Sequence, residues 1–372
     1  MLNDIPHNLI IKSAQKNYPV DFFPKLSLLV EQLSLIRNPI VIIDSNILHL
    51  YGAEFSTLTT SAPVFVVSAN EETKSFEYVG NILAWLSDQK CTKSNHIVAI
   101  GGGIIQDLAA FCAGVFFRGL SWSFVPTTLL SMSDSCIGAK SGLNFRQSKN
   151  QIGLFNSPNR VYIAPNFLQT LSELEIKSGY GEILKLHITG GFEKFSELVS
   201  SLSTQNGSLL GQHTIRHIAD SLLIKKQIIE IDEYEHGLRA TLNYGHTFGH
   251  AIEAATEHAI PHGIAVGWGL DFENFLAMNS GKLAYSKYKS IKEFIRMSLS
   301  VEPFQGSTER ILEFAKKDKK AVSSSEVNLI LFTDEDKLQI TKTRFDDQLK
   351  KQLDEYLLSE DPFRPRNIAK PH

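Results

Sequence analysis

Three short apolar runs in the first third of the chain restrict its fold more than any other feature. They are residues 39–44, 64–67 and 96–100, and the third leads directly into three glycines. Runs without alternating polar residues are typical of strands buried on both faces, as in parallel sheets covered by helices. Residues 76–86 have apolar side chains three and four positions apart, as on one face of a helix. We therefore predict a doubly wound α/β domain over residues 1–165.

The remainder of the chain, residues 166–372, is dominated by longer segments with helical periodicity. A chain of 372 residues also exceeds what one hydrophobic core commonly serves, so two domains are expected. We predict that the second domain is mainly α-helical, with one late strand at 327–332. The predicted helical segments are 171–190, 194–203, 209–233, 246–258, 263–280 and 308–320.

The overall charge and the cysteines narrow the class of protein. A net charge of −3 gives no global positive field, so we expect no nucleic-acid partner and no anionic membrane surface. No stretch approaches the roughly 20 apolar residues that span a bilayer, and the N-terminal segment lacks the pattern of a signal peptide. The three cysteines are odd in number and have no CxxC spacing, which favours a reducing compartment. We expect a cytoplasmic protein.

Two segments of the first domain have the composition of a site for a phosphorylated ligand. Gly101–Gly103 follow a predicted strand and open a helical pattern with Asp107 in its first turn, so backbone N–H groups can approach phosphate closely. A plain strand-to-helix turn has the same pattern. Residues 126–150 gather hydroxyls, amides and lysines that suit a polyanion, although a solvated loop also has such a composition.

A histidine cluster in the second domain has the spacing of a metal site. His246 and His250 are four residues apart, so on a helix both imidazoles lie on one face. With His262 after a turn and Glu182 on another predicted helix, they offer the nitrogen and oxygen ligands that catalytic Zn²⁺ prefers. Either both His246 and His250 bind metal, or one binds while the other acts as a base or hydrogen-bond donor. A purely structural HxxxH pair is the remaining interpretation.

The spacing between these segments is as informative as the segments themselves. The matching blocks are Gly101–Gly103 with Asp107, Arg118–Gly119, Pro126–Leu130, Asp134, Gly138–Lys140, Asn144, Lys149–Asn150, Glu182–Lys185, Asp232–Arg239, Leu242–Glu253 and His262–Gly263. Together they resemble the 3-dehydroquinate synthase family of sugar phosphate cyclases. The resemblance extends over about residues 40–335.

The resemblance implies an N-terminal Rossmann-like NAD-binding α/β domain, a mainly helical metal-binding domain, and Zn²⁺ or Co²⁺ as the metal. It implies NAD contacts at Asp44, Asn46, Glu71, Lys74, Gly102, Gly103, Ile104, Asp107, Thr127, Thr128, Lys149 and Phe167 to Thr170. It implies metal ligation by Glu182, His246 and His262, and catalytic roles for Glu235, His250, Lys185 and Asp134. Substrate contacts are implied at Arg118, Lys140, Asn150, Lys225, Arg239, Asn243 and Lys320, with Lys319 as the alternative to the last. Arg118 matches a residue that the family inserts into the neighbouring subunit's site, which implies a homodimer.

The family's chemistry implies a function in the shikimate pathway of aromatic amino acid biosynthesis. Its members cyclise 3-deoxy-D-arabino-heptulosonate 7-phosphate to 3-dehydroquinate: NAD takes a hydride, phosphate is eliminated, the hydride is returned, and an aldol step closes the ring. NAD is therefore not consumed. Arg239 and Lys225 match the residues that hold the substrate carboxylate, and relatives that take sedoheptulose 7-phosphate lack this pair. A ketulosonate phosphate substrate is therefore favoured.

Other functions remain open at this point. They are another sugar phosphate cyclase (of the amino-dehydroquinate or sedoheptulose 7-phosphate type), a metal-dependent polyol dehydrogenase, and an inactive NAD-binding scaffold. Three residues depart from the commonest family pattern: Gln106 replaces Gly, Gly181 replaces Ala, and Ile264 replaces a Glu beside the third metal ligand. None of the three removes a metal ligand or a charged substrate contact, and Ile264 lies beside the predicted metal site.

Overall fold

The computed structural model describes residues 9–146, 148–300, 307–317, 321–323 and 325–359. The chain divides into two compact units. The first comprises Met1–Ser172 with Lys225–Tyr234, and the second Glu173–Ile224 with Glu235–His372.

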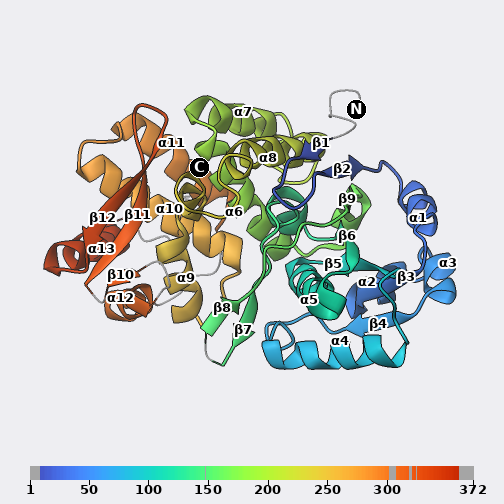
Figure 1. Ribbon diagram of the computed structural model, residues 1–372. Coiled ribbons are helices and arrows are strands. Elements are labelled where there is room, and N and C mark those ends of the chain that lie inside the picture. The colour runs from blue at the N-terminus through green and yellow to red at the C-terminus, as the bar shows by residue number, and fades with distance from the viewer. Residues whose placement is uncertain (1–8, 147, 301–306, 318–320, 324, 360–372) are drawn as a thin grey trace. The chain divides into compact units, whose positions relative to one another are not determined.

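The first unit is built on a seven-stranded sheet with the order β1-β2-β9-β6-β5-β3-β4 (Figure 1). β1 is antiparallel to β2, and every other neighbouring pair is parallel. The strands are β1 (Leu9–Ile11), β2 (Tyr18–Phe22), β3 (Pro39–Asp44), β4 (Val64–Val67), β5 (His96–Gly101), β6 (Ser121–Pro126) and β9 (Arg160–Ile163), with a separate hairpin of β7 (Leu143–Phe145) and β8 (Ser148–Ile152).

The predicted parallel sheet is confirmed, because two of the three apolar runs match β3 and β4 residue for residue and the third extends by one residue to form β5. Ile40, Val41, Ile42 and Ile43 are at most 1% exposed. Such a strand is buried on both faces, which explains why its sequence does not alternate.

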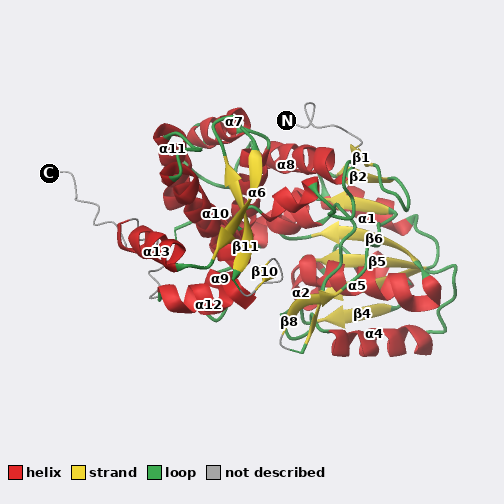
Figure 2. Cartoon of the chain, turned by 60° about the vertical axis from the view of Figure 1, so that its left-hand side comes forward, coloured by secondary structure: helices red, strands yellow, loops and turns green. Residues whose placement is uncertain are grey.

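Helices cover this sheet. α5 packs on β3, β5 and β6, and α2 packs on β3 and β4, as Figure 2 lets the reader follow. Only the extended residue Gly102 separates β5 from α5. The helices of this unit are α1 (Leu26–Ser34), α2 (Ser45–Tyr51), α3 (Ser56–Ser61), α4 (Phe76–Asp88) and α5 (Gly103–Val115), with the short turns η1 (Phe116–Arg118), η2 (Ser131–Ser135, a π-helix) and η3 (Pro165–Thr170).

The second unit is mainly helical, as predicted, around a central helix α10 (His262–Asn279). Residues 263–277 of α10 are all buried, because α6, α9, α11 and β11 surround it. A helix that is buried on all sides needs neighbours around its whole circumference, and here the polar residues Asp271, Glu273 and Asn274 are enclosed as well. The other helices are α6 (Glu173–Thr189), α7 (Phe192–Ser203), α8 (Thr214–Ile229, whose end from Lys225 belongs to the first unit), η4 (Leu238–Asn243), α9 (His246–Ala255), α11 (Tyr285–Ser298), α12 (Thr308–Lys317) and α13 (Asp347–Ser359).

A small antiparallel sheet completes the second unit. It has the order β10-β11-β12, formed by Ala321–Ser323, Glu326–Phe332 and Leu338–Arg344. β11 contains the predicted strand 327–332 and packs on α10. Over the described part of the chain, no helix combines the length and the apolar character needed to cross a bilayer.

Candidate functional site

Three side chains from three helices of the second unit converge on one point. Glu182 lies in the middle of α6, and His246 and His262 are the first residues of α9 and α10. His246 Nε2 lies 3.6 Å and His262 Nε2 3.3 Å from Glu182 Oε1. Among the described residues, this is the one group of three or more whose potential ligand atoms all lie within 4.8 Å of one another.

The imidazoles are held by their second nitrogens. His246 Nδ1 donates to the carbonyl of Tyr244 at 3.1 Å, and His262 Nδ1 lies 3.1 Å from Glu253 Oε2. This leaves both Nε2 atoms directed at Glu182, the arrangement by which a ligating histidine is fixed in one tautomer. Burial lowers the pKa of His262, but the neighbouring carboxylates of Glu182 and Glu253 outweigh it and raise the pKa to about 9.

The Glu182 carboxylate shows that a cation suits this position. The residue is 2% exposed, and within the described chain neither of its oxygens accepts a hydrogen bond of normal geometry, although Lys185 Nζ lies 2.5 Å from Oε2. A buried carboxylate is costly unless it is paired or coordinates a metal, and Lys185 pairs with Oε2 only, while Oε1 faces the two imidazoles. One carboxylate and two neutral imidazoles form a ligand set that Zn²⁺ and Co²⁺ accept, with a coordination position left for substrate. The residues present therefore fit a divalent metal ion.

Two glycines bring the helices that carry these ligands close together. A Cβ atom at Gly181 would lie 1.8 Å from the carbonyl oxygen of Gly263, and one at Gly263 would lie 1.8 Å from that of Ser178. The N–H of Gly263 also donates to Ser178 Oγ at 3.0 Å. The backbones of α6 and α10 are thus in direct contact, which explains why Gly181 occupies a position where the family pattern has Ala.

Other residues of the second unit that were predicted as catalytic or substrate-binding lie near the three converging side chains, beside one another or in the interior. The ring of His250 lies 5.4 Å from that of His246 and 5.5 Å from that of His262, between ring centroids. Asn243 Nδ2 donates to Glu235 Oε1 at 2.6 Å, and Glu235 has a left-handed backbone with φ of 62°. Arg239, in η4, is only 4% exposed.

In the first unit, most of the residues implied for NAD follow the carboxyl ends of parallel strands. These ends meet at one edge of the sheet, where open α/β folds bind their ligands. Phe167 is buried and packs against Tyr51 and Phe55. The residues at this edge are Asp44 and Asn46 after β3, Glu71 and Lys74 after β4, Gly102, Gly103, Ile104 and Asp107 after β5, Thr127 and Thr128 after β6, and Phe167 and Thr170 after β9.

Polar residues of this edge bind one another. Lys74 Nζ lies 2.7 Å from Asp107 Oδ2; burial raises the pKa of Asp107, and the Lys74 ammonium opposes that shift. Lys225 donates to both the carboxylate and the carbonyl of Asp134, the latter at 2.6 Å.

The departure at Gln106 is explained by a pair of hydrogen bonds. Its Nε2 donates to the carbonyl of Ser135 and its Oε1 accepts from Ser135 Oγ, both at 2.7 Å. Because Asp134 precedes Ser135 in the π-helix, the glutamine fixes the segment that carries Asp134.

Several predicted residues lie apart from these clusters. Lys140 and Lys149 are exposed, and Lys149 and Asn150 lie in β8. Arg118 ends η1, and Lys320 lies outside the described residues. Glu253, the partner of His262 Nδ1, was not predicted as a site residue. Its position seven residues after His246, two helical turns along the same face of α9, is the signal that could have found it.

Comparisons with known proteins agree with the resemblance. The family descriptions 3-dehydroquinate synthase N-terminal and 3-dehydroquinate synthase C-terminal match residues 64–178 and 179–321. A relative from Thermoanaerobacter pseudethanolicus named 3-dehydroquinate synthase is 33% identical, over 92% of this chain and 98% of its own.

Solved structures show the same fold at lower identity. A 2-epi-5-epi-valiolone synthase from Streptomyces hygroscopicus, with NAD⁺ and Zn²⁺ bound, has a TM-score of 0.80 at 22% identity, over 94% of this chain and 98% of its own. A 2-deoxy-scyllo-inosose synthase complexed with carbaglucose-6-phosphate, NAD⁺ and Co²⁺ has a TM-score of 0.78 at 22% identity, over 94% of this chain and 99% of its own. Because the two family matches extend over most of the chain and the Thermoanaerobacter relative is similar along nearly its whole length, this chain belongs to the 3-dehydroquinate synthase family, whose members are lyases that act on phosphates.

Proposed function

We propose that this chain converts 3-deoxy-D-arabino-heptulosonate 7-phosphate to 3-dehydroquinate and inorganic phosphate, with NAD and a divalent metal ion as cofactors. The observation that carries the proposal is the convergence of Glu182, His246 and His262 in a chain of this family. Two neutral imidazole nitrogens and one buried carboxylate would hold Zn²⁺ or Co²⁺. The ion would polarise the substrate hydroxyl that is oxidised.

The first unit supplies the NAD site in this proposal. The N–H groups at the start of α5, at Gly103 and Ile104, would bind the pyrophosphate, because helix N-termini favour anions. Asp44, at the end of β3, would bind a ribose hydroxyl, the usual role of an acidic residue at such a strand end. NAD would accept a hydride from the substrate and return it later in the same cycle.

The chain's own polar groups bind and orient the substrate. Arg239 binds its carboxylate, since a guanidinium forms two parallel hydrogen bonds with that planar group. Asn243 and His250 bind the phosphate. Glu235, whose carboxylate accepts a hydrogen bond from Asn243 at 2.6 Å, orients a neighbouring group or exchanges a proton with it. Lys185, beside Glu182 at 2.5 Å, stabilises negative charge that develops on the substrate. We assign Lys140, Asn150 and Lys225 to substrate binding as well.

The proposal includes a homodimer in the cytoplasm in which Arg118 reaches the neighbouring subunit's site. Phe117, Arg118 and Gly119 have φ values of 50°, 60° and 125°, a run of left-handed backbone that is unfavourable for the two non-glycine residues. Strain of this kind persists only where the surrounding structure over-determines it, and it clusters at functional sites. Sedimentation should show a dimer, and mixing Arg118→Ala with an Arg239→Ala variant should restore activity only if the two sites exchange Arg118.

The direct test follows inorganic phosphate and NADH together. Purified protein is incubated with NAD⁺, Zn²⁺ or Co²⁺ and 3-deoxy-D-arabino-heptulosonate 7-phosphate. Phosphate release with 3-dehydroquinate and no net NADH is the expected result. Release from sedoheptulose 7-phosphate alone would keep the fold and overturn the substrate, and net NADH production would indicate a polyol dehydrogenase.

Arg239 gives a sharper test of the substrate class. Arg239→Ala should reduce kcat/KM for the ketulosonate phosphate by about tenfold or more, the value of a charge-assisted hydrogen bond, with NAD affinity unchanged. Arg310→Ala, which removes an exposed arginine paired with Glu257, is the matched control. Equal loss of substrate and NAD binding would show that Arg239 is misplaced in this proposal.

A further inference from the structure

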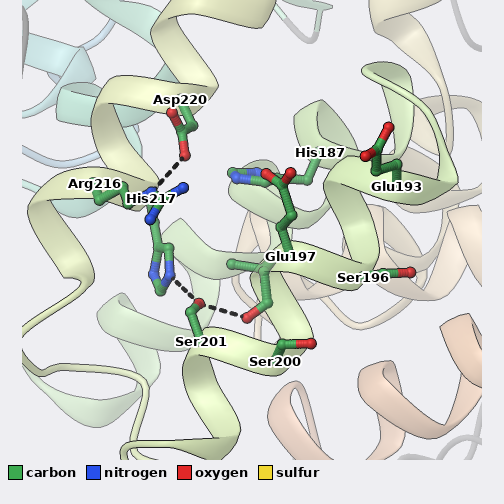
Figure 3. Close-up of a pocket in the computed structure, with 10 residues that line it drawn as sticks. His187, Glu193, Ser196, Glu197, Ser200, Ser201, Arg216, His217 and Asp220 are labelled. Carbon is green, nitrogen blue, oxygen red and sulfur yellow. Dashed lines mark hydrogen bonds and ion pairs between the residues drawn. The ribbon is translucent and has the colours of Figure 1, made fainter. Parts of the chain in front are cut away.

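The second unit contains a cavity that the proposed function does not use. It has a volume of about 380 Å³ and is lined by residues of α6, α7 and α8, which Figure 3 shows as sticks. Cavities of a few hundred Å³ accommodate small organic molecules. His187, its residue from α6, comes five positions after Glu182 and therefore points to a different side of that helix from the metal ligands.

His187 presents a hydrogen-bond acceptor to this cavity. The side chain is only 2% exposed, and its Nδ1 lies 2.8 Å from the carbonyl of Ile183. A carbonyl only accepts, so Nδ1 carries the proton; burial lowers the pKa of His187, which keeps the ring neutral. Nε2 then bears a lone pair, for which no partner exists among the described residues. Figure 3 shows this ring beside Glu197 on the cavity side of α6.

Carboxylates dominate the charged lining. Glu193, Glu197 and Asp220 line the cavity, while the cations near them are already engaged. Arg216 Nε lies 3.5 Å from Asp220 Oδ2, and Lys194 Nζ lies 2.8 Å from Glu197 Oε2. Glu193 forms no ion pair with any described residue. Three carboxylates against two cations leave one negative charge at the cavity.

The second histidine that lines the cavity, His217, is held in place by hydrogen bonds and adds no positive charge. His217 Nδ1 lies 3.0 Å from the hydroxyl of Tyr180, and its Nε2 lies 2.6 Å from Ser201 Oγ. Both ring nitrogens are therefore used. Burial lowers the pKa of His217 to about 3, so the ring stays neutral at physiological pH.

We propose that this cavity binds a small organic ammonium compound, whose N–H groups donate to His187 Nε2 and to the Glu193, Glu197 and Asp220 carboxylates. The cavity offers mainly acceptors and a net negative charge, which selects a donor-rich cation. A bare metal ion fits less well, because among the described residues the one group of three or more potential ligands within 4.8 Å of one another is Glu182, His246 and His262, outside this cavity. The cavity groups are spread more widely and match a ligand of several atoms.

Calorimetric titration of the Zn²⁺- and NAD-loaded protein with 1,4-diaminobutane tests the proposal. Saturable binding is expected, while 1,4-butanediol, which has the same shape without charge, should bind at least about tenfold more weakly because it lacks the charge-assisted hydrogen bonds. No saturable heat with the diamine overturns the proposal. Equal binding of the diol overturns the assignment of a cation.

Variants locate the binding. Glu197→Gln and Asp220→Asn, at non-buried positions that tolerate substitution, should each weaken diamine binding by about three- to tenfold, and His187→Leu should weaken it further. Glu335→Gln removes the same charge from an exposed turn of the second unit and should change nothing. Unchanged affinity in both carboxylate variants overturns the site even if His187→Leu fails to fold. Zn²⁺ binding in excess of one ion, lost in Asp220→Asn, would replace the ammonium by a metal.

Discussion

The polar clusters of the two units differ in what they leave unsatisfied. In the first unit, Lys74 binds Asp107 and Lys225 binds Asp134, so the charges of the sheet edge compensate one another. In the second unit, the histidines are held from outside by Tyr244 and Glu253, and their remaining nitrogens converge on a buried carboxylate. The first cluster is a closed network that holds its shape without a ligand. In the second, Lys185 pairs with one oxygen of Glu182, and the other oxygen and the two imidazoles can share a metal ion once His262 gives up its proton.

The largest effect should come from the carboxylate of the second cluster. Glu182→Gln removes the one anionic ligand and should lower Zn²⁺ affinity by more than about a hundredfold, with loss of phosphate release. Glu253→Gln, which only weakens the hydrogen bond that orients His262, should lower Zn²⁺ affinity by about ten- to a hundredfold. Equilibrium dialysis with Zn²⁺ measures both. If the order of the two variants were reversed, Glu182 would not be the central ligand.

Breaking the first cluster should cost stability. Asp134→Asn or Lys225→Met alone leaves a buried group without its ion pair, and we expect a loss of about 3–5 kcal/mol in the free energy of unfolding. The double variant should lose less than the sum, because neither charge is then left alone. Urea unfolding of the four proteins measures the coupling. Strict additivity would contradict the closed network.

The next largest effect should come from a substitution at the backbone contact between α6 and α10. Gly181→Ala places a Cβ atom 1.8 Å from the carbonyl of Gly263, so we expect a loss of about 1–3 kcal/mol together with weaker Zn²⁺ binding. Gly80→Ala, in α4, has no atom within 4 Å of the new Cβ and should stabilise the first unit by about 0.5–1 kcal/mol. Equal effects of the two changes, measured by urea unfolding, would contradict the close approach.

A smaller, pH-dependent effect should come from Asp271 on α10. Burial raises its pKa from 3.8 to about 6, against the lowering influence of the hydrogen bond from Tyr356. The folded state therefore holds this proton more tightly, and stability falls as the pH rises from 3.8 through 6. Asp271→Asn should remove this loss. The free energy of unfolding of the variant should exceed that of the parent by on the order of 1 kcal/mol above pH 6, and the two should be equal below pH 3.8. Urea unfolding at both ends of this pH range measures the two free energies. A difference between variant and parent that stays constant with pH would contradict the raised pKa of Asp271.

The sequence predicted those strands of the first unit that are continuous apolar runs. β3 and β4 could be bounded to the residue because continuous apolar runs have sharp ends. β6, with the sequence Ser-Trp-Ser-Phe-Val-Pro, alternates at its start and was not predicted as a strand, and β12 was missed because it has polar side chains on both faces. Local pattern does not reveal a strand whose register is set by its neighbours.

The candidate site could be predicted in composition but not in arrangement. The spacing of His246 and His250 places both on one face of a helix, and from spacing alone either could be a ligand. In the folded chain His246 and His262 face Glu182, while His250 lies beside them. The orienting role of Glu253, and the locking of Ser135 by Gln106, depend on contacts between distant segments that no local pattern contains.

The glycine contact between α6 and α10 has a consequence for engineering the protein. Where two helices are separated by side chains, any change of rotamer or volume alters their spacing. Here the peptide groups of Gly181, Gly263 and Ser178 touch directly, so the separation of Glu182 from His262 is limited by hard contact between main-chain atoms. The spacing between these metal ligands should therefore survive extensive redesign of the surrounding apolar residues, provided that Gly181 and Gly263 are kept.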